Sequence, residues 1–102
     1  MTIYTDIFGD QIELTSERWF HIVQEHPEVS EYSSLFTEVL SDPDYVKKSN
    51  RDEDILLYYK LFENIRYGKY LIIVLKKNLR SFILTCYITD VLKKGATVWE
   101  RK

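Results

Sequence analysis

The chain has few of the residues on which several classes of protein depend. Its 102 residues include one cysteine, three glycines and two histidines, and no apolar run approaches the roughly 20 residues that a membrane-spanning helix needs. A single cysteine cannot form an internal disulfide, which is typical of a protein from a reducing compartment. No secretory leader pattern opens the chain. We therefore expect a soluble, cytoplasmic protein with no membrane partner.

The same scarcity argues against three kinds of site. The glycines, at positions 9, 68 and 95, are too scattered to form a glycine-rich phosphate loop. His21 and His26 are five residues apart, about 140° around a helix, so they cannot grip one metal ion as an i, i+4 pair does. Cys86 alternates with Leu84 and Ile88, which indicates a buried structural thiol rather than a nucleophile. We expect no metal and no cofactor.

Charge is distributed unevenly along the chain. Residues 1–46 carry ten acids and one base, a net charge of −9, whereas residues 47–102 carry six acids and thirteen bases, a net charge of +7. The overall charge of −2 conceals this difference. The basic half could attract phosphates or an acidic partner, or it could be an ordinary solvated surface.

Hydrophobic periodicity predicts one α+β domain over residues 1–102. The expected elements are a hairpin over Thr2–Leu14, helices over Ser16–Glu25 and Val29–Leu40, and strands over Tyr45–Ser49, Ile55–Phe62, Lys69–Lys77, Ser81–Thr89 and Ala96–Glu100. We expect the two N-terminal helices to pack on an antiparallel sheet of about four to five strands, with the short β-hairpin preceding them.

The first helix holds an unusual set of side chains. Thr15 or Ser16 can cap its N-terminus, and Pro27 ends it. One stripe at i, i+3, i+4, i+7 spacing consists of Trp19, Ile22, Val23 and His26. A second stripe beside it consists of Arg18, His21 and Glu25. Burial alone does not explain the second stripe, so this helix is the leading candidate to carry catalytic residues.

Strand alternation predicts which side chains share a face of the sheet. Phe82, Leu84, Cys86 and Ile88 should lie in the core under the helices, and Ser81, Ile83, Thr85, Tyr87 and Thr89 on the other face. If Phe62 lies opposite Lys69 and Lys77 opposite Ser81, two rows cross three strands. These rows are Lys60–Leu71–Tyr87 and Tyr58–Ile73–Thr85. A slip of one residue would send a strand's side chains to the opposite face.

These residues fit general acid–base chemistry on a phosphate. Histidine titrates near neutral pH, and a cation can stabilise charge that develops on phosphorus oxygens. Such a set suffices for metal-independent RNA cleavage, in which the 2′-OH attacks the adjacent phosphorus. We expect His21 to come first, with its imidazole supported by Glu25, and His26 second, since His26 could instead cap the helix end. Lys60 is the expected phosphate stabiliser, and Thr85 and Tyr87 are expected to orient the substrate. The expected substrate-binding residues are Arg18, Tyr58, Lys69, Lys76, Lys77 and Thr89.

Several motifs in order along the chain resemble those of one family. They are Ile12-Glu13-Leu14-Thr15-Ser16-Glu17-Arg18-Trp19-Phe20-His21-Ile22, His26-Pro27-Glu28, Asp42-Pro43-Asp44-Tyr45-Val46, Tyr58-Tyr59-Lys60, Gly68-Lys69-Tyr70-Leu71, Thr85-Cys86-Tyr87-Ile88-Thr89 and Lys93-Lys94-Gly95 with Trp99. In these the chain resembles the phage- and bacteria-associated nuclease domains of the barnase–EndoU–colicin–RelE-like superfamily (the BECR fold).

The resemblance implies helices followed by an antiparallel sheet and a metal-independent endoribonuclease of toxin type. It also implies messenger or transfer RNA as the substrate and a separate antitoxin protein as a partner. Two alternatives remain open at this point. One is a non-catalytic domain that binds RNA or an acidic protein through its basic half, and the other is a small interaction domain with structural histidines.

Overall fold

The computed structural model describes all residues from Met1 to Lys102, and its elements confirm the α+β class. The strands are β1 (Thr2–Thr5), β2 (Gln11–Leu14), β3 (Tyr45–Lys48), β4 (Ile55–Phe62), β5 (Lys69–Lys76), β6 (Ser81–Thr89) and β7 (Thr97–Glu100). The helices are α1 (Ser16–Glu25) and α2 (Phe36–Ser41), with a 3₁₀ segment, η1 (Pro27–Leu35), between them. None of these helices combines the length and the apolar character that crossing a membrane requires.

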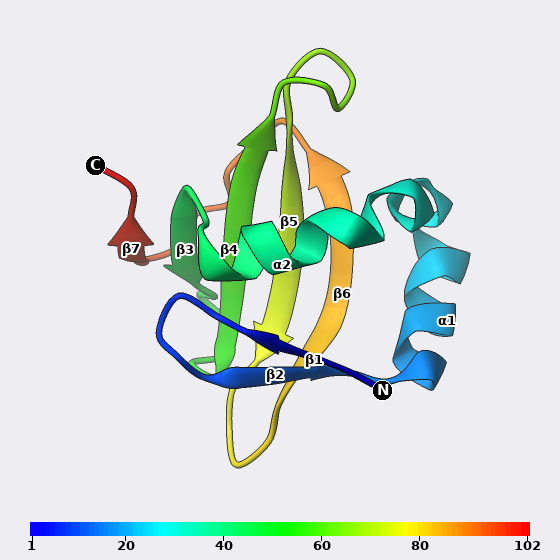
Figure 1. The fold of residues 1–102 in the computed structure, drawn as a ribbon. Helices are drawn as coiled ribbons and strands as arrows, with labels where there is room; N and C mark the ends of the chain where they lie inside the picture. Colours follow the sequence, from blue (N-terminus) through cyan, green and yellow to red (C-terminus); the bar gives the residue numbers. More distant parts are fainter.

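All seven strands form one mixed sheet in the order β1-β2-β6-β5-β4-β3-β7. Its single parallel pair joins β2 to β6, so the hairpin belongs to the sheet rather than merely preceding it. The expected sheet of four to five antiparallel strands is therefore too small. The physical reason lies in Ile12 and Leu14, which are buried because β2 closes the edge of β6. Figure 1 shows α2 across one face of the sheet and α1 beside β6.

The second predicted helix, Val29–Leu40, is divided into two parts. Residues Pro27–Leu35 form the 3₁₀ segment η1, and only Phe36–Ser41 is α-helical. The hydroxyl of Ser30 donates to the carbonyl of Pro27 at 3.0 Å, a local bond that competes with helical geometry. The apolar spacing nevertheless serves burial, since Val29, Phe36 and Leu40 are fully inside the core.

A β-bulge in β6 makes the register of β5 with β6 differ from the predicted one. The expected pairing of Phe62 with Lys69 is confirmed. Next to Leu84, however, the partner of Val74 is Thr85 and the partner of Leu75 is Ile83, so β6 holds one extra residue. Ile83 consequently lies in the helix-side core, and Leu84 packs on the other face. Both assignments reverse the prediction.

The bulge also breaks the two predicted rows. Lys60 does lie opposite Leu71, but the next residue in that row is Ile88, not Tyr87. Tyr58 does lie opposite Ile73, but Cys86 follows, not Thr85. Thr85 and Tyr87 therefore share a face with each other, and Lys60 and Tyr58 lie on the opposite, helix-side face.

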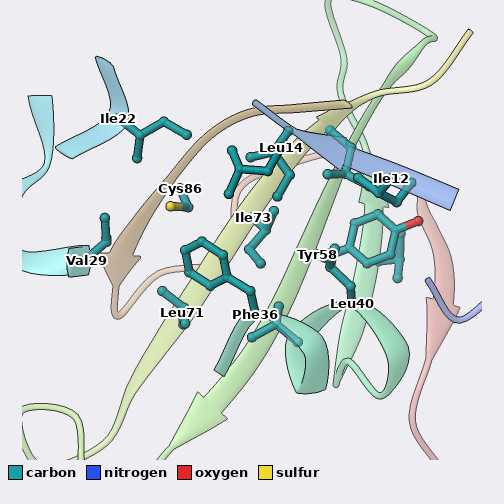
Figure 2. Close-up of a cluster of buried hydrophobic side chains, with 14 of the residues drawn as sticks. Ile12, Leu14, Ile22, Val29, Phe36, Leu40, Tyr58, Leu71, Ile73 and Cys86 are labelled. Carbon is teal, nitrogen blue, oxygen red and sulfur yellow. The ribbon is translucent and has the colours of Figure 1, made fainter. Parts of the chain in front are cut away.

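The larger core lies between the helices and the sheet (Figure 2). Every helical segment and the hairpin contribute to it: Ile12 and Leu14 from β2, Ile22 from α1, Val29 from η1, and Phe36 and Leu40 from α2. They meet Tyr58, Leu71, Ile73 and Cys86 from the sheet. Trp19 packs its ring edge-on to Phe36, with centroids 5.8 Å apart. This packing fixes which side of α1 faces outward.

The other face of the sheet, which we call the far face, has its own buried residues: Leu57, Tyr59, Ile72 and Val74. No helix covers them. The connection from β6 to β7, which we call the crossover segment (residues 90–96), passes across this face (Figure 1). Leu92 packs against the cluster, and the backbone N–H of Lys93 donates to the hydroxyl of Tyr59 at 3.0 Å. The crossover segment thus takes the place of a covering helix.

Candidate functional site

The largest concave site lies between α1 and the edge of the sheet. This α1 cleft has a volume of about 620 Å³. The charged and aromatic residues that line it are Glu13, Glu17, Arg18, His21, Glu25, Arg80 and Phe82. They come from β2, α1, the β5–β6 turn and β6, so the parallel pairing of β2 with β6 creates the cleft. One imidazole, carboxylates and two guanidinium groups meet in one solvent-accessible space.

The sequence of α1 determines which residues reach this cleft. The hydroxyl of Thr15 accepts the backbone N–H of Arg18 at 3.1 Å and so caps the helix. Ile22 is buried in the core. Residues three and four apart on a helix are neighbours, with Cβ atoms about 5–6 Å apart, so Arg18 and Glu25 flank His21 on the outward side. The predicted second stripe is therefore the wall of the cleft.

Glu13 and Arg80 are bonded to each other, whereas the side chains from α1 have no such partner. Arg80 forms two hydrogen bonds with Glu13, from Nε to Oε2 at 2.9 Å and from Nη2 to Oε1 at 2.5 Å. The hydrogen bonds from Arg80 hold the pKa of Glu13 below its usual range. No hydrogen bond or ion pair joins His21 to Glu25, so the predicted support of the imidazole is absent. His21 and Arg18 are free to meet a ligand.

His26, Thr85 and Tyr87 lie apart from the cleft, at the edge of the far face. The imidazole of His26 lies 5.4 Å from the Tyr87 ring, and the ammonium of Lys93 lies 5.7 Å from the same ring. Nδ1 of His26 is 3.7 Å from Glu28. We call His26, Thr85, Tyr87 and Lys93 the far-face cluster. The end of α1 reaches around β6, which is how a histidine from the helix layer meets the far face.

The two hydroxyl groups of the far-face cluster are buried. Oγ1 of Thr85 and the hydroxyl oxygen of Tyr87 are shielded from solvent, and neither has a hydrogen-bond partner. Thr89, the third predicted hydroxyl, accepts the backbone N–H of Val91 at 3.2 Å and so helps to start the crossover segment. In this structure a substrate could therefore not contact either the Thr85 or the Tyr87 hydroxyl.

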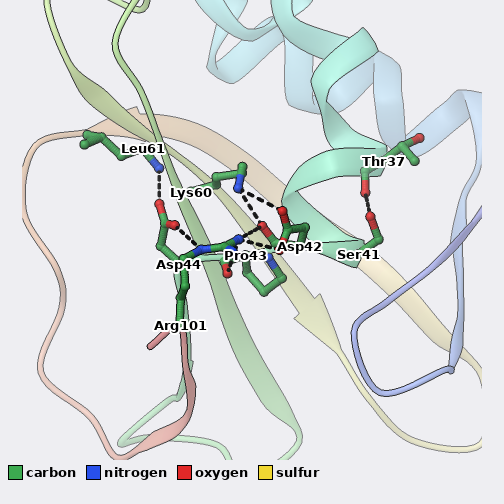
Figure 3. Close-up of polar contacts among 8 residues, drawn as sticks. All are labelled: Thr37, Ser41, Asp42, Pro43, Asp44, Lys60, Leu61 and Arg101. Carbon is green, nitrogen blue, oxygen red and sulfur yellow. Dashed lines mark hydrogen bonds and ion pairs between the residues drawn. The ribbon is translucent and has the colours of Figure 1, made fainter.

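Lys60, the expected phosphate stabiliser, is bonded to the turn between α2 and β3 (Figure 3). Its ammonium donates to the backbone carbonyl of Asp42 at 2.8 Å and lies 3.5 Å from the Asp42 carboxylate. Arg101 bonds to the same segment, through the carbonyl of Asp42 at 2.8 Å and Oδ1 of Asp44 at 2.9 Å. The Asp-Pro-Asp sequence is thus a clamp that attaches the C-terminal strand β7 to the α2–β3 turn.

The predicted substrate-binding residues of the sheet are also occupied. Tyr58 is buried, and its hydroxyl donates to Asp6 at 2.5 Å. The lysines form ion pairs: Lys69 with Asp90 at 3.2 Å, Lys76 with Asp52 at 2.5 Å, and Lys77 with both Asp6 and Asp10. Five acids of the first 46 residues form ion pairs with bases of the second half: Asp6, Asp10, Glu13, Asp42 and Asp44. Six of the thirteen bases in residues 47–102 are therefore in ion pairs, namely Lys60, these three lysines, Arg80 and Arg101.

Other chemistries find little support among the side chains. No group of three or more His, Cys, Asp or Glu residues is arranged to hold a metal ion. Cys86 is buried, and burial, with a smaller effect of Glu28, raises the pKa of its thiol to about 12. A thiol with that pKa is protonated at neutral pH and is a poor nucleophile.

Sequence reasoning found three residues of the α1 cleft and missed the rest. Arg18, His21 and Glu25 are close in sequence and share a helix face, so periodicity identifies them. Glu13 and Arg80 are 67 residues apart, and only the parallel pairing of β2 with β6 brings them together. The opposite charge of Glu13 and Arg80 is the one feature of the sequence that could have suggested this pair. No protein-family model, curated protein or solved structure matches this chain.

Proposed function

We propose that the chain is a metal-independent endoribonuclease whose acid–base site is the α1 cleft. The observation that carries the proposal is the meeting of His21, Arg18 and Glu25 in the one large cleft of the molecule. Cleavage of RNA by its own 2′-OH needs a base, an acid and a cation, and no further group. The cleft offers all three in one accessible place.

The chemical steps follow from these side chains. The carboxylate of Glu25 removes the proton of the 2′-OH, whose oxygen then attacks the adjacent phosphorus. Protonated His21 donates a proton to the departing 5′-oxygen, which leaves a 2′,3′-cyclic phosphate and a free 5′-hydroxyl. Arg18 stabilises the negative charge that develops on the phosphorus oxygens, and Phe82 offers a flat surface for a base. Arg80 is held by Glu13 and frames the opposite wall.

The resemblance to nuclease domains of the BECR fold supports the wider setting of this proposal. On that ground we propose a toxin that acts on messenger or transfer RNA in the cytoplasm and is neutralised by a separate antitoxin protein. The alternative, a non-catalytic domain that binds through its basic half, has less support. Lys60, Lys69, Lys76 and Lys77 already have carboxylate partners, so few of the predicted cations are free for phosphates.

The test compares two histidines of the same helix in purified protein, with EDTA in the RNA cleavage assay. The His21→Gln variant should cleave roughly 10²–10⁴-fold more slowly than the parent, the usual loss when a general acid is removed. The His26→Gln variant is the matched control and should cleave within a few-fold of the parent. Thermal melting verifies that both variants are folded.

Each other outcome has a definite meaning. A His21→Gln variant that cleaves like the parent removes the α1 cleft from the mechanism. If His26→Gln alone abolishes cleavage, the active site is the far-face cluster. If the pure parent shows no cleavage of any RNA, the proposed function is wrong.

A further inference from the structure

The loop between β4 and β5 carries an exposed pair of residues in an unfavourable backbone conformation. The backbone N–H of Gly68 donates to the carbonyl of Ile65 at 2.9 Å, which closes a four-residue turn. The two central residues, Arg66 and Tyr67, have φ angles of +44° and +65°. Positive φ at both central positions defines a type I′ turn, which strongly prefers Asn-Gly. Arg and Tyr are disfavoured there because Cβ crowds the backbone.

The turn is fixed rather than loose. Ile65, its first residue, is fully buried in the helix-side core. The backbone N–H of Ile65 also donates to the carbonyl of Phe62 at 3.2 Å, which ties the turn to the end of β4. The core therefore determines where the Arg66–Tyr67 tip points. Figure 1 shows this loop projecting beyond the sheet, at the end away from the β5–β6 turn.

Nothing inside the molecule explains the two side chains. Tyr67 is fully exposed, and neither Arg66 nor Tyr67 takes part in a side-chain hydrogen bond, an ion pair or an aromatic contact. Asn-Gly in place of Arg66-Tyr67 would suit the turn better and would remove no contact within the molecule. The fold uses the turn but not these two side chains, and strained positions of this kind tend to occur at functional sites.

We propose that Arg66 and Tyr67 bind single-stranded RNA at a point distant from the α1 cleft. A fully exposed tyrosine ring offers a stacking surface to an unpaired base, and an adjacent guanidinium without an acid partner offers a phosphate contact. The exposed acid Glu63 in the same loop is the one feature that opposes it. This inference rests on the proposed function, since it names a substrate contact for that enzyme.

The position of the tip makes the inference specific to long substrates. The cleft includes Arg80, just past the Lys76 end of β5, whereas the tip precedes the Lys69 end. The eight residues of β5 place these two ends about 23 Å apart. A dinucleotide bound at the Arg80 end of the cleft is too short to span this separation, whereas a long unstructured RNA can contact both the cleft and the tip. Losing the tip should therefore change KM for long RNA only.

The test uses the double variant Arg66→Asn/Tyr67→Gly, which relieves the strain while it removes both contacts. We expect its Tm to rise, its KM for long unstructured RNA to increase roughly tenfold, the loss expected for one stacked base, and its cleavage of a dinucleotide to stay unchanged. The conservative variant Arg66→Lys/Tyr67→Phe keeps the charge and the ring, so it should retain most of the affinity for long RNA.

A second measurement separates this inference from the proposed function. Binding of a long 2′-O-methyl RNA, which lacks the attacking hydroxyl, is measured for the parent and the double variant. Parental affinity in the double variant overturns the inference even if the parent cleaves RNA. Weakened binding supports the inference even if the parent does not cleave. If the double variant instead loses only a protein partner and binds RNA like the parent, the tip is a protein contact and the RNA assignment is wrong.

Discussion

Removing a hydroxyl group from the interior should make this protein more stable. Oγ1 of Thr85 is buried on the far face without a hydrogen-bond partner. Its cross-strand neighbour is Val74, and the surrounding cluster is largely apolar. Replacing Thr85 by Val keeps the branched shape and exchanges the hydroxyl for a methyl group. The Thr85→Val variant therefore loses no hydrogen bond and gains apolar contact.

The size of the effect follows from the penalty for burying an unpaired hydroxyl. Mutational data give about 1–3 kcal/mol for such a group. We expect the free energy of unfolding of Thr85→Val to rise by about 1–2 kcal/mol, and its Tm to rise by about 4–8 °C for each kcal/mol in a domain of this size. Tyr87→Phe should also raise stability, because the ring that meets His26 and Lys93 is retained.

A matched control lies on the same face of the same strand. The hydroxyl of Thr89 accepts the N–H of Val91 at 3.2 Å and lies 3.3 Å from the Val91 carbonyl. The Thr89→Val variant should therefore be less stable than the parent, by up to about 1 kcal/mol. Urea unfolding measures both variants, with an unchanged m-value as the sign that only stability differs. A Thr85→Val variant less stable than the parent would refute the reasoning, because its hydroxyl would then have a partner.

Three further predictions concern the ion pairs and the thiol. Burial alone would raise the pKa of Asp6, but hydrogen bonds from Lys77 and Tyr58 and from the backbone outweigh it and lower that pKa. The stability that Asp6 contributes is then complete above its unfolded pKa of 3.8 and is lost as pH falls through the lower folded value. Asp6→Asn should lower the free energy of unfolding near pH 7 by about 3 kcal/mol and make that free energy depend less on pH in the acid range. Urea unfolding at several acid pH values measures this, and the same pH dependence in parent and variant would contradict the prediction. Arg101→Ala should lower the Tm because it opens the clamp at Asp42 and Asp44, whereas Lys102→Ala, whose side chain makes no ion pair, should not. Cys86, with its thiol pKa raised to about 12 by burial, should resist a thiol reagent in the native protein and react after unfolding; rapid native labelling would show that the thiol is accessible.

Local features of the sequence were sufficient for much of the framework. Thr15 and Pro27 mark the ends of α1 because a cap and a missing N–H act within one helical turn. The pairing of Phe62 with Lys69 follows from a short loop, since a hairpin register is determined by the residues that join its strands. The three α1 residues of the cleft were predictable for the same reason: they are neighbours along one helix.

The remaining features depend on contacts between distant parts of the chain. The extra residue at Leu84 is not visible in alternation, because Ile83 and Leu84 are both apolar and either could face the core. That one residue puts Thr85 and Tyr87 on the face opposite Lys60. The charge asymmetry predicted a basic surface, yet Asp6, Asp10 and Asp42 fold back on Lys77 and Lys60. These pairs join residues far apart in the sequence, so a count of charges along the chain cannot reveal them.

The sequence by itself determined the α+β class, the helix that carries Arg18, His21 and Glu25, and the hairpin of β4 and β5, because each depends on periodicity or on a turn between adjacent residues. Only the tertiary structure decided that β2 pairs with β6 and so joins Glu13 and Arg80 to that helix in one cleft. The pairing is decided by the burial of Ile12 and Leu14 against an otherwise open sheet edge, and burial is a property of the whole fold.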